Sequence, residues 1–143
     1  MSLVPVNFAT NQVNAMTAKG PEHTRVALID DDASVRSAVS RLLRSYDYIC
    51  NAYESAEAAL DDPDLTSAQC LVIDVQLSGM NGFALRDRLL HSGVHIPCLF
   101  ITAHAETSAP DWVRGIGNCL CVIKPFDESQ LLEAILTAVK QHI

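Results

Sequence analysis

The stretch CLVIDVQLSGMNG, Cys70–Gly82, decides the fold that this sequence predicts. A short apolar run ends on one carboxylate, Asp74, and a turn with two glycines follows at once. A continuous apolar run of this length, bounded by turn residues, is typical of a strand buried on both faces of a sheet. We therefore expect Asp74 to end a central strand, where its carboxylate is poised for chemistry.

Four further apolar runs have the length of buried strands, and most of these runs are followed by apolar residues at helical spacing. The strands are predicted at 26–29, 48–53, 71–74, 97–101 and 120–123. The helices are predicted at 35–46, 56–60, 83–90, 106–116 and, after an Asp127–Gln130 capping box, 131–139. This alternation predicts an α/β protein, (βα)5, whose doubly wound five-stranded parallel sheet is covered by helices on both faces.

Polar residues stand just after four of the five predicted strands. Asp30 and Asp31 follow the first, Asp74 ends the third, and Thr102 and Lys124 follow the fourth and fifth. Ligands of parallel α/β sheets bind beyond the carboxyl ends of the strands. With the strand order 2-1-3-4-5, the four strands that carry these residues are consecutive in the sheet. We therefore expect the five side chains to meet.

The charges at this edge predict a phosphate site. Three carboxylates about 5 Å apart repel by roughly 3 kcal/mol per pair at an effective dielectric constant of about 20. Lys124 supplies one compensating charge, and Mg²⁺ would supply the rest, because it prefers carboxylates, water and a phosphate oxygen as ligands. Asp74 could then act as a nucleophile toward a phosphoryl group, while Thr102 donates its hydroxyl to the phosphoryl oxygens.

Composition limits the alternatives. The 143 residues, 49% of them hydrophobic, are enough for one core, which we place at 24–143 after a flexible tail at 1–23. No apolar stretch reaches the roughly 18 residues of a membrane span, and the N-terminus lacks a secretory signal. The cysteines lie mostly inside apolar runs, which is typical of buried free thiols rather than of a disulfide framework. Free thiols are expected in a reducing compartment, so we expect a cytoplasmic location. A net charge of −7 argues against direct binding of nucleic acid by this segment.

Four motifs together resemble the receiver domain of two-component response regulators, of the CheY-like superfamily. They are most similar to the receivers of FixJ-type regulators. They are IDDD at 29–32, VIDVQLSGMNG at 72–82, FITAH at 100–104 and VIKPF at 122–126. The resemblance covers about 24–143 and implies a flavodoxin-like fold. It also implies a phosphoacceptor signalling domain rather than an enzyme, with at most self-catalysed phosphorylation and dephosphorylation.

The resemblance assigns roles at the acidic end of the pocket. It makes Asp74 the phosphoacceptor, and Asp30 and Asp31 the acidic pair that positions Mg²⁺. Asp74 and the backbone carbonyl of Gln76 would be further metal ligands, and Asp32 a bystander that forms a turn or caps a helix.

The resemblance also assigns the residues that respond to phosphorylation. Thr102 would be the switch hydroxyl, and Lys124 the phosphoryl-contacting lysine before a peptide bond to Pro125 that is usually cis in the family. Gln76 and His104 look like the variable positions that tune the lifetime of the phosphoryl group.

Two positions depart from the family pattern. Cys121 stands where an aromatic switch residue is usual, and Ser78 replaces a proline of the turn after the phosphoacceptor. We expect Ser78 to loosen the loop and to add a hydroxyl near the site. Together with Pro110 in the fourth helix region, these departures leave the phosphorylation residues intact but put the usual signal relay in question.

The function expected from the resemblance is that of a two-component response regulator receiver. A sensor histidine kinase or phosphotransfer protein would phosphorylate Asp74, and the surface of the fourth helix, fifth strand and fifth helix would signal to an output domain, a target protein or a second copy in a phosphorylation-linked homodimer. The chain ends at Ile143, so we expect a stand-alone receiver or part of a longer regulator. The alternatives are an atypical receiver that acts as an interaction module and a haloacid-dehalogenase-like phosphatase.

Overall fold

The computed structural model describes residues 24–103 and 119–142. The predicted tail at 1–23, the predicted helix at 106–116 and His104 lie outside the described residues. The strands are β1 (Arg25–Ile29), β2 (Ile49–Tyr53), β3 (Cys70–Asp74), β4 (Cys98–Thr102) and β5 (Cys119–Ile123). The helices are α1 (Ala33–Ser45), α2 (Ala56–Asp61), α3 (Gly82–His91) and α6 (Glu128–His142), with a 3-10 helix η1 (Pro63–Ser67).

The five strands form one parallel sheet in the order β2-β1-β3-β4-β5, which confirms the predicted topology. The register sets Asp74 beside Ile101 of β4 and Thr102 beside Ile123 of β5. The carboxyl ends of the strands therefore lie at one edge of the sheet.

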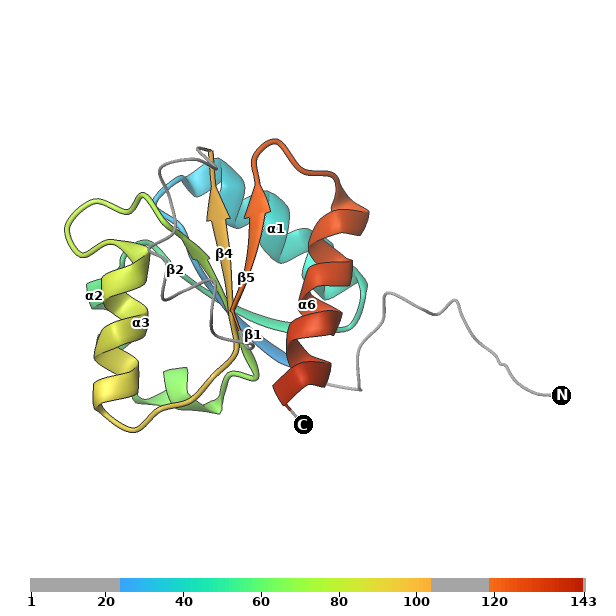
Figure 1. Ribbon diagram of the computed structural model, residues 1–143. Helices are drawn as coiled ribbons and strands as arrows, with labels where there is room; N and C mark the ends of the chain where they lie inside the picture. Colours follow the sequence, from blue (N-terminus) through green and yellow to red (C-terminus); the bar gives the residue numbers. More distant parts are fainter. Residues whose placement is uncertain (1–23, 104–118, 143) are drawn as a thin grey trace, which may run out of the picture.

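Helices cover both faces of the sheet (Figure 1). On one face, α1 and α6 bury Leu43 and Ile135 against the strands, and on the other, α2 and α3 bury Ala59 and Leu85. Successive strand residues point to opposite faces, so Val72 belongs to the first cluster while its neighbours belong to the second. Burial on both faces explains why β1, β3 and β4 are almost continuously apolar, whereas the edge strand β2 exposes Asn51 and Ala52.

Helix starts follow the local sequence signals. Asp127 and Gln130 form the predicted capping box of α6: the Asp127 amide donates to Gln130 Oε1 at 2.9 Å, and the Gln130 amide donates to Asp127 Oδ1 at 2.8 Å. Ser55 caps α2 by accepting the Ala58 amide at its hydroxyl oxygen. The Gln130 amide, together with the Ser129 hydroxyl, donates to the Asp127 carboxylate and so holds the pKa of Asp127 below its usual range.

The boundaries differ from the prediction in small ways. The fourth strand was expected to begin at Pro97, but β4 begins at Cys98. The short helix η1 was not predicted; it starts with Pro63 directly after its N-cap, Asp62. Within the described ranges, no helix combines the length and the apolar character that crossing a bilayer requires.

Candidate functional site

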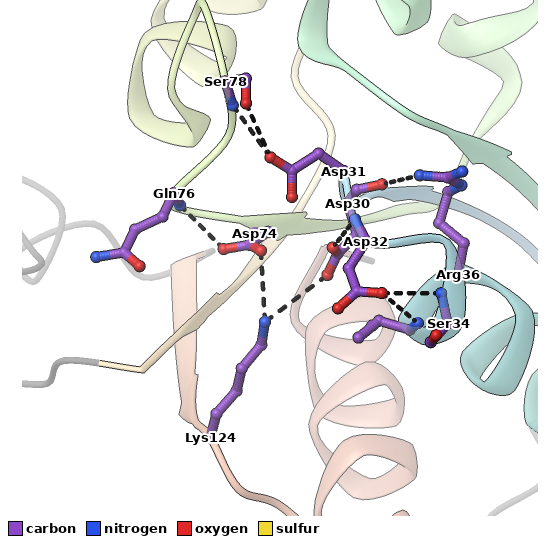
Figure 2. A network of polar contacts seen from close by, with 10 residues as sticks. Asp30, Asp31, Asp32, Ser34, Arg36, Asp74, Gln76, Ser78 and Lys124 are labelled. Carbon is purple, nitrogen blue, oxygen red and sulfur yellow. Dashed lines mark hydrogen bonds and ion pairs between the residues drawn. The ribbon is translucent and has the colours of Figure 1, made fainter.

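The sheet brings the predicted acidic residues together at the carboxyl ends of its strands. One oxygen each from Asp30, Asp31 and Asp74 can be chosen so that all three lie within 4.8 Å of one another. Lys124 reaches this cluster from the end of β5 (Figure 2). The convergence expected from the strand order is confirmed for these four residues.

Asp74 is held at the end of β3 by contacts to both of its carboxylate oxygens. The residue is 7% exposed, its Oδ1 accepts the Gln76 amide at 2.9 Å, and its Oδ2 lies 3.4 Å from Lys124 Nζ. The start of α3 packs closely behind it, since a Cβ on Gly82 would lie only 2.7 Å from the backbone oxygen of Asp74. Glycine is therefore required where the helix meets the strand.

Asp30 is the most deeply buried member of the cluster, with no exposed surface. Its Oδ1 accepts the Asp32 amide at 2.9 Å. Its Oδ2 has no hydrogen-bond donor among the described residues and lies 3.9 Å from Lys124 Nζ. Burial raises the pKa of this carboxyl, and the negative charges of Asp74 and Asp31 raise it further, while the Asp32 amide and Lys124 oppose the shift.

Asp31 and Asp32 have different surroundings although they are adjacent. Asp32 is the N-cap of α1, as its Oδ1 accepts the Ser34 amide at 2.8 Å, so its predicted role as a cap is confirmed. Asp31 Oδ2 instead accepts both the backbone amide of Ser78, at 3.3 Å, and the Ser78 hydroxyl, at 3.2 Å. The predicted hydroxyl near the site is therefore present.

Thr102 and Cys121 lie on the neighbouring strands β4 and β5. Thr102 ends β4, is 1% exposed, and accepts the Lys124 amide at its backbone oxygen at 2.8 Å. The peptide between Lys124 and Pro125 is cis, as expected. Cys121 lies in β5 beside Phe100 of β4, with an exposed side chain. The loosening expected from Ser78 stays a prediction.

Sequence reasoning missed two residues around this pocket. Arg36 on α1 donates from Nη1 to the backbone oxygen of Asp30 at 2.8 Å. Glu57 on α2 accepts the Met80 amide at 3.1 Å and so anchors the loop between β3 and α3. Neither residue lies in a motif of the pocket, and only the packing of the helices on the sheet brings them to it.

The donor set fits a small hard cation. Three carboxylates, one of them with a buried oxygen that lacks a hydrogen-bond donor among the described residues, face one ammonium group. The pocket is therefore rich in negative charge, and all of its ligand atoms are the oxygens that Mg²⁺ prefers. The residues fit the metal that the sequence predicted.

Fold and site together define a doubly wound α/β domain with an acidic pocket at the carboxyl ends of its strands. The model of the response regulator receiver domain family matches residues 26–136. The chain belongs to this family, and the predicted family and fold are confirmed.

Named relatives agree with this assignment. Nodulation protein W of Bradyrhizobium diazoefficiens is 36% identical over 120 residues, which cover 81% of this chain and 51% of that protein. Transcriptional regulatory protein FixJ of the same organism is 30% identical over 126 residues, covering 88% of this chain and 60% of that protein. The chain thus spans about half the length of the curated relatives that it matches.

Solved structures give the same picture. The response regulator StyR superposes with a TM-score of 0.75 at 32% identity, covering 82% of this chain and 59% of that one. A response regulator receiver protein from Burkholderia phymatum superposes with a TM-score of 0.67 at 31% identity, covering 81% of this chain and 94% of that one.

Proposed function

We propose that this receiver domain accepts a phosphoryl group on Asp74 from the phosphohistidine of a sensor histidine kinase or phosphotransfer protein, in a Mg²⁺-dependent reaction. One observation carries the proposal: Asp74 is nearly buried, 3.4 Å from Lys124 Nζ, and within one cluster of carboxylates with Asp30 and Asp31. This arrangement supplies a nucleophile, a cation and metal ligands in one pocket.

The phosphoryl transfer needs no general base in the pocket, because the attacking carboxylate carries no proton to remove. An ionised carboxylate oxygen of Asp74 forms a bond to phosphorus, and the bond between phosphorus and the donor's histidine nitrogen breaks. The electron pair of that bond stays on the ring nitrogen, so a ring protonated at its other nitrogen leaves as neutral imidazole. The product is an aspartyl phosphate.

The chain's own residues position the carboxylate and receive the transferred group. The Gln76 amide fixes Asp74 Oδ1, and Lys124 lies where it neutralises charge on the phosphoryl oxygens. Thr102 would donate its hydroxyl to one of these oxygens. Its position at the end of β4, beside Lys124 at the end of β5, supports that role.

Mg²⁺ would be held by Asp30, Asp31 and Asp74 together with the backbone carbonyl of Gln76. When bound, the ion supplies positive charge to the phosphoryl oxygens and balances the carboxylates. Without it, three negative charges face the single ammonium group of Lys124 within this part of the structure.

The output follows from the surface beside the pocket. We propose that phosphorylation changes the face that includes β5 and α6, where Ile123 is 49% exposed, and that this face signals to an output domain, a target protein or a second copy. His104 and Gln76 would tune the lifetime of the phosphoryl group. The segment would act as a signalling domain without direct contact to nucleic acid, in keeping with its net charge of −7.

A cytoplasmic location is part of the same proposal. Three described cysteines, Cys50, Cys70 and Cys98, are buried thiols, and Cys121 is an exposed one. Thiols without disulfides are the rule in reducing compartments.

The interaction-module alternative is not favoured, because Asp30, Asp31, Asp74 and Lys124 lie close together, as the proposed phosphorylation requires. The phosphatase alternative is not supported either, because the family match is to receivers and Gln76 stands where that class has a second aspartate.

Intact-mass measurement after incubation with phosphoramidate and Mg²⁺ tests the proposal. The wild type should gain one phosphoryl group and Asp74→Asn none. Asp32→Asn is the matched control: it makes the same change two positions from Asp30, and asparagine caps α1 equally well. An adduct that persists in Asp74→Asn, or that is lost in Asp32→Asn, would contradict the assignment.

A further inference from the structure

The loop between β3 and α3 is tied to the metal-binding cluster through one side chain. Ser78 donates to Asp31 Oδ2 twice, from its backbone amide at 3.3 Å and from its hydroxyl at 3.2 Å (Figure 2). Both residues are exposed and 47 positions apart in the chain. An exposed aspartate would otherwise rotate freely, so this double contact selects one orientation of its carboxylate.

The two oxygens of Asp31 are thereby made unequal. A carboxylate oxygen has about two lone-pair sites, and both sites of Oδ2 are engaged by Ser78. Oδ1 accepts no hydrogen bond from the part of the chain that the structure describes, and is left for a cation.

Asp31 lies within the cluster while it is bonded to Ser78. With Ser78 bound to Asp31, the three carboxylates still offer ligand atoms within 4.8 Å of one another.

The loop does not depend on this contact alone. Glu57 Oε2 also accepts the Met80 amide of this loop, at 3.1 Å, and the Ser78 amide would still reach Asp31 in an alanine variant. Removing the hydroxyl therefore tests the orientation of Asp31 without releasing the loop.

We propose that Ser78 is a positioning residue for Mg²⁺: its hydroxyl orients Asp31 so that the second oxygen of that carboxylate is presented to the ion. The inference rests on the metal site of the proposed function. Hydrogen bonds to a ligating carboxylate fix its orientation before the metal arrives, and losing such a partner typically costs about 10- to 100-fold in metal affinity. Because the Ser78 amide remains, the alanine variant should lie at the low end, near about tenfold.

Titration calorimetry with MgCl₂, without any phosphodonor, tests the proposal on the full chain. Ser78→Ala should bind Mg²⁺ about tenfold more weakly than the wild type, and Ser78→Thr, which keeps the hydroxyl, should bind with nearly wild-type affinity. Ser67→Ala is the matched control, because within the described residues the Ser67 hydroxyl bonds only the Asp64 backbone oxygen, at 2.7 Å, away from the pocket. Thermal unfolding without Mg²⁺ should be the same for Ser78→Ala, Ser78→Thr and the wild type.

Several outcomes would overturn the inference. Wild-type or tighter affinity in Ser78→Ala would show that the hydroxyl is idle or competes with the ion, and a Ser78→Thr variant as weak as Ser78→Ala would show that the hydroxyl is not the cause. A wild type that binds no Mg²⁺ would also end it. A wild type that binds Mg²⁺ but takes no phosphoryl group would defeat the proposed function and leave the role of Ser78 standing.

Discussion

Lys124 places its Nζ 3.4 Å from Asp74 Oδ2 and 3.9 Å from Asp30 Oδ2, so one ammonium group serves two carboxylates. Fifty residues separate Lys124 from Asp74, and β4 lies between their strands in the sheet. The Lys124 amide bonds the backbone oxygen of Thr102, which fixes the start of this side chain at the sheet edge. The charge balance of the pocket therefore depends on the end of β5.

Removing the positive charge of Lys124 and removing the negative charge of Asp74 should shift the pKa of Asp30 in opposite directions. Lys124→Met should raise it further, because the ammonium opposes the upward shift, whereas Asp74→Asn should lower it, because the neighbouring carboxylate contributes to that shift. Carbon-detected NMR titration of the Asp30 carboxyl in metal-free buffer measures both. Shifts of the same sign in the two variants would contradict this electrostatic account of the pocket.

Asp30→Asn should stabilise the metal-free protein at neutral pH. The folded pKa of Asp30 is raised, so the unfolded chain, with its ordinary value of 3.8, loses this proton first as pH rises. Wild-type stability therefore falls as pH climbs from the ordinary aspartate range through the raised pKa. The gain in Tm of the variant should be present at neutral pH and disappear below about pH 4.

Mg²⁺ should reverse that ranking. The ion binds the folded wild type and raises its Tm by mass action, but a variant without the Asp30 charge should gain much less. Thermal unfolding with and without MgCl₂ at neutral pH provides the comparison, with Asp32→Asn as the control that keeps the wild-type response. If the metal raised the Tm of Asp30→Asn as much as that of the wild type, Asp30 would not be a ligand.

Gly82→Ala should destabilise the domain by roughly 1–3 kcal/mol, the usual cost of overpacking. The added Cβ would lie 2.7 Å from the Asp74 backbone oxygen and 2.8 Å from Ile73 Cγ2, so either the start of α3 or the end of β3 must shift. Urea unfolding measures the loss. Because the strained atom belongs to Asp74, phosphorylation should also slow.

Gly93→Ala separates this clash from the general cost of replacing a glycine. Gly93 has a φ of 81° but nothing within 4 Å of an added Cβ, so its variant should lose only the conformational penalty of about 1–2 kcal/mol and phosphorylate normally. Slow phosphorylation in Gly93→Ala would show that the effect at Gly82 is not local to Asp74.

The fold could be predicted because its signals are local and repeated. Each apolar run is short and ends in polar or turn residues, and the Asp127–Gln130 and Ser55 caps mark helix starts in the sequence itself. The meeting of Asp30, Asp74 and Lys124 then needed only the strand order. The 3-10 helix after Asp62 was missed, because a proline that follows a helix usually marks only the end of that helix, whereas Pro63 also starts the next one.

The finer structure of the pocket could not be predicted in the same way. The contact of Ser78 with Asp31 depends on how a loop folds back over the end of β1, and periodicity says nothing about loops. Arg36 and Glu57 come to the pocket from helix surfaces, where charged residues are ordinary and carry no signal of a contact. These contacts depend on how the helices and the loop pack on the sheet, which the sequence pattern does not show.

The central claim is that Asp74 is the phosphoacceptor, and chemical mapping of the phosphorylated residue tests it most directly. Borohydride reduces an aspartyl phosphate to homoserine, which peptide mass spectrometry can locate. After treatment with phosphoramidate and Mg²⁺, we expect homoserine at position 74 in the peptide that contains β3, and at no other aspartate. Homoserine at position 30, 31 or 32, or none at all in a protein that carries a phosphoryl group, would contradict it.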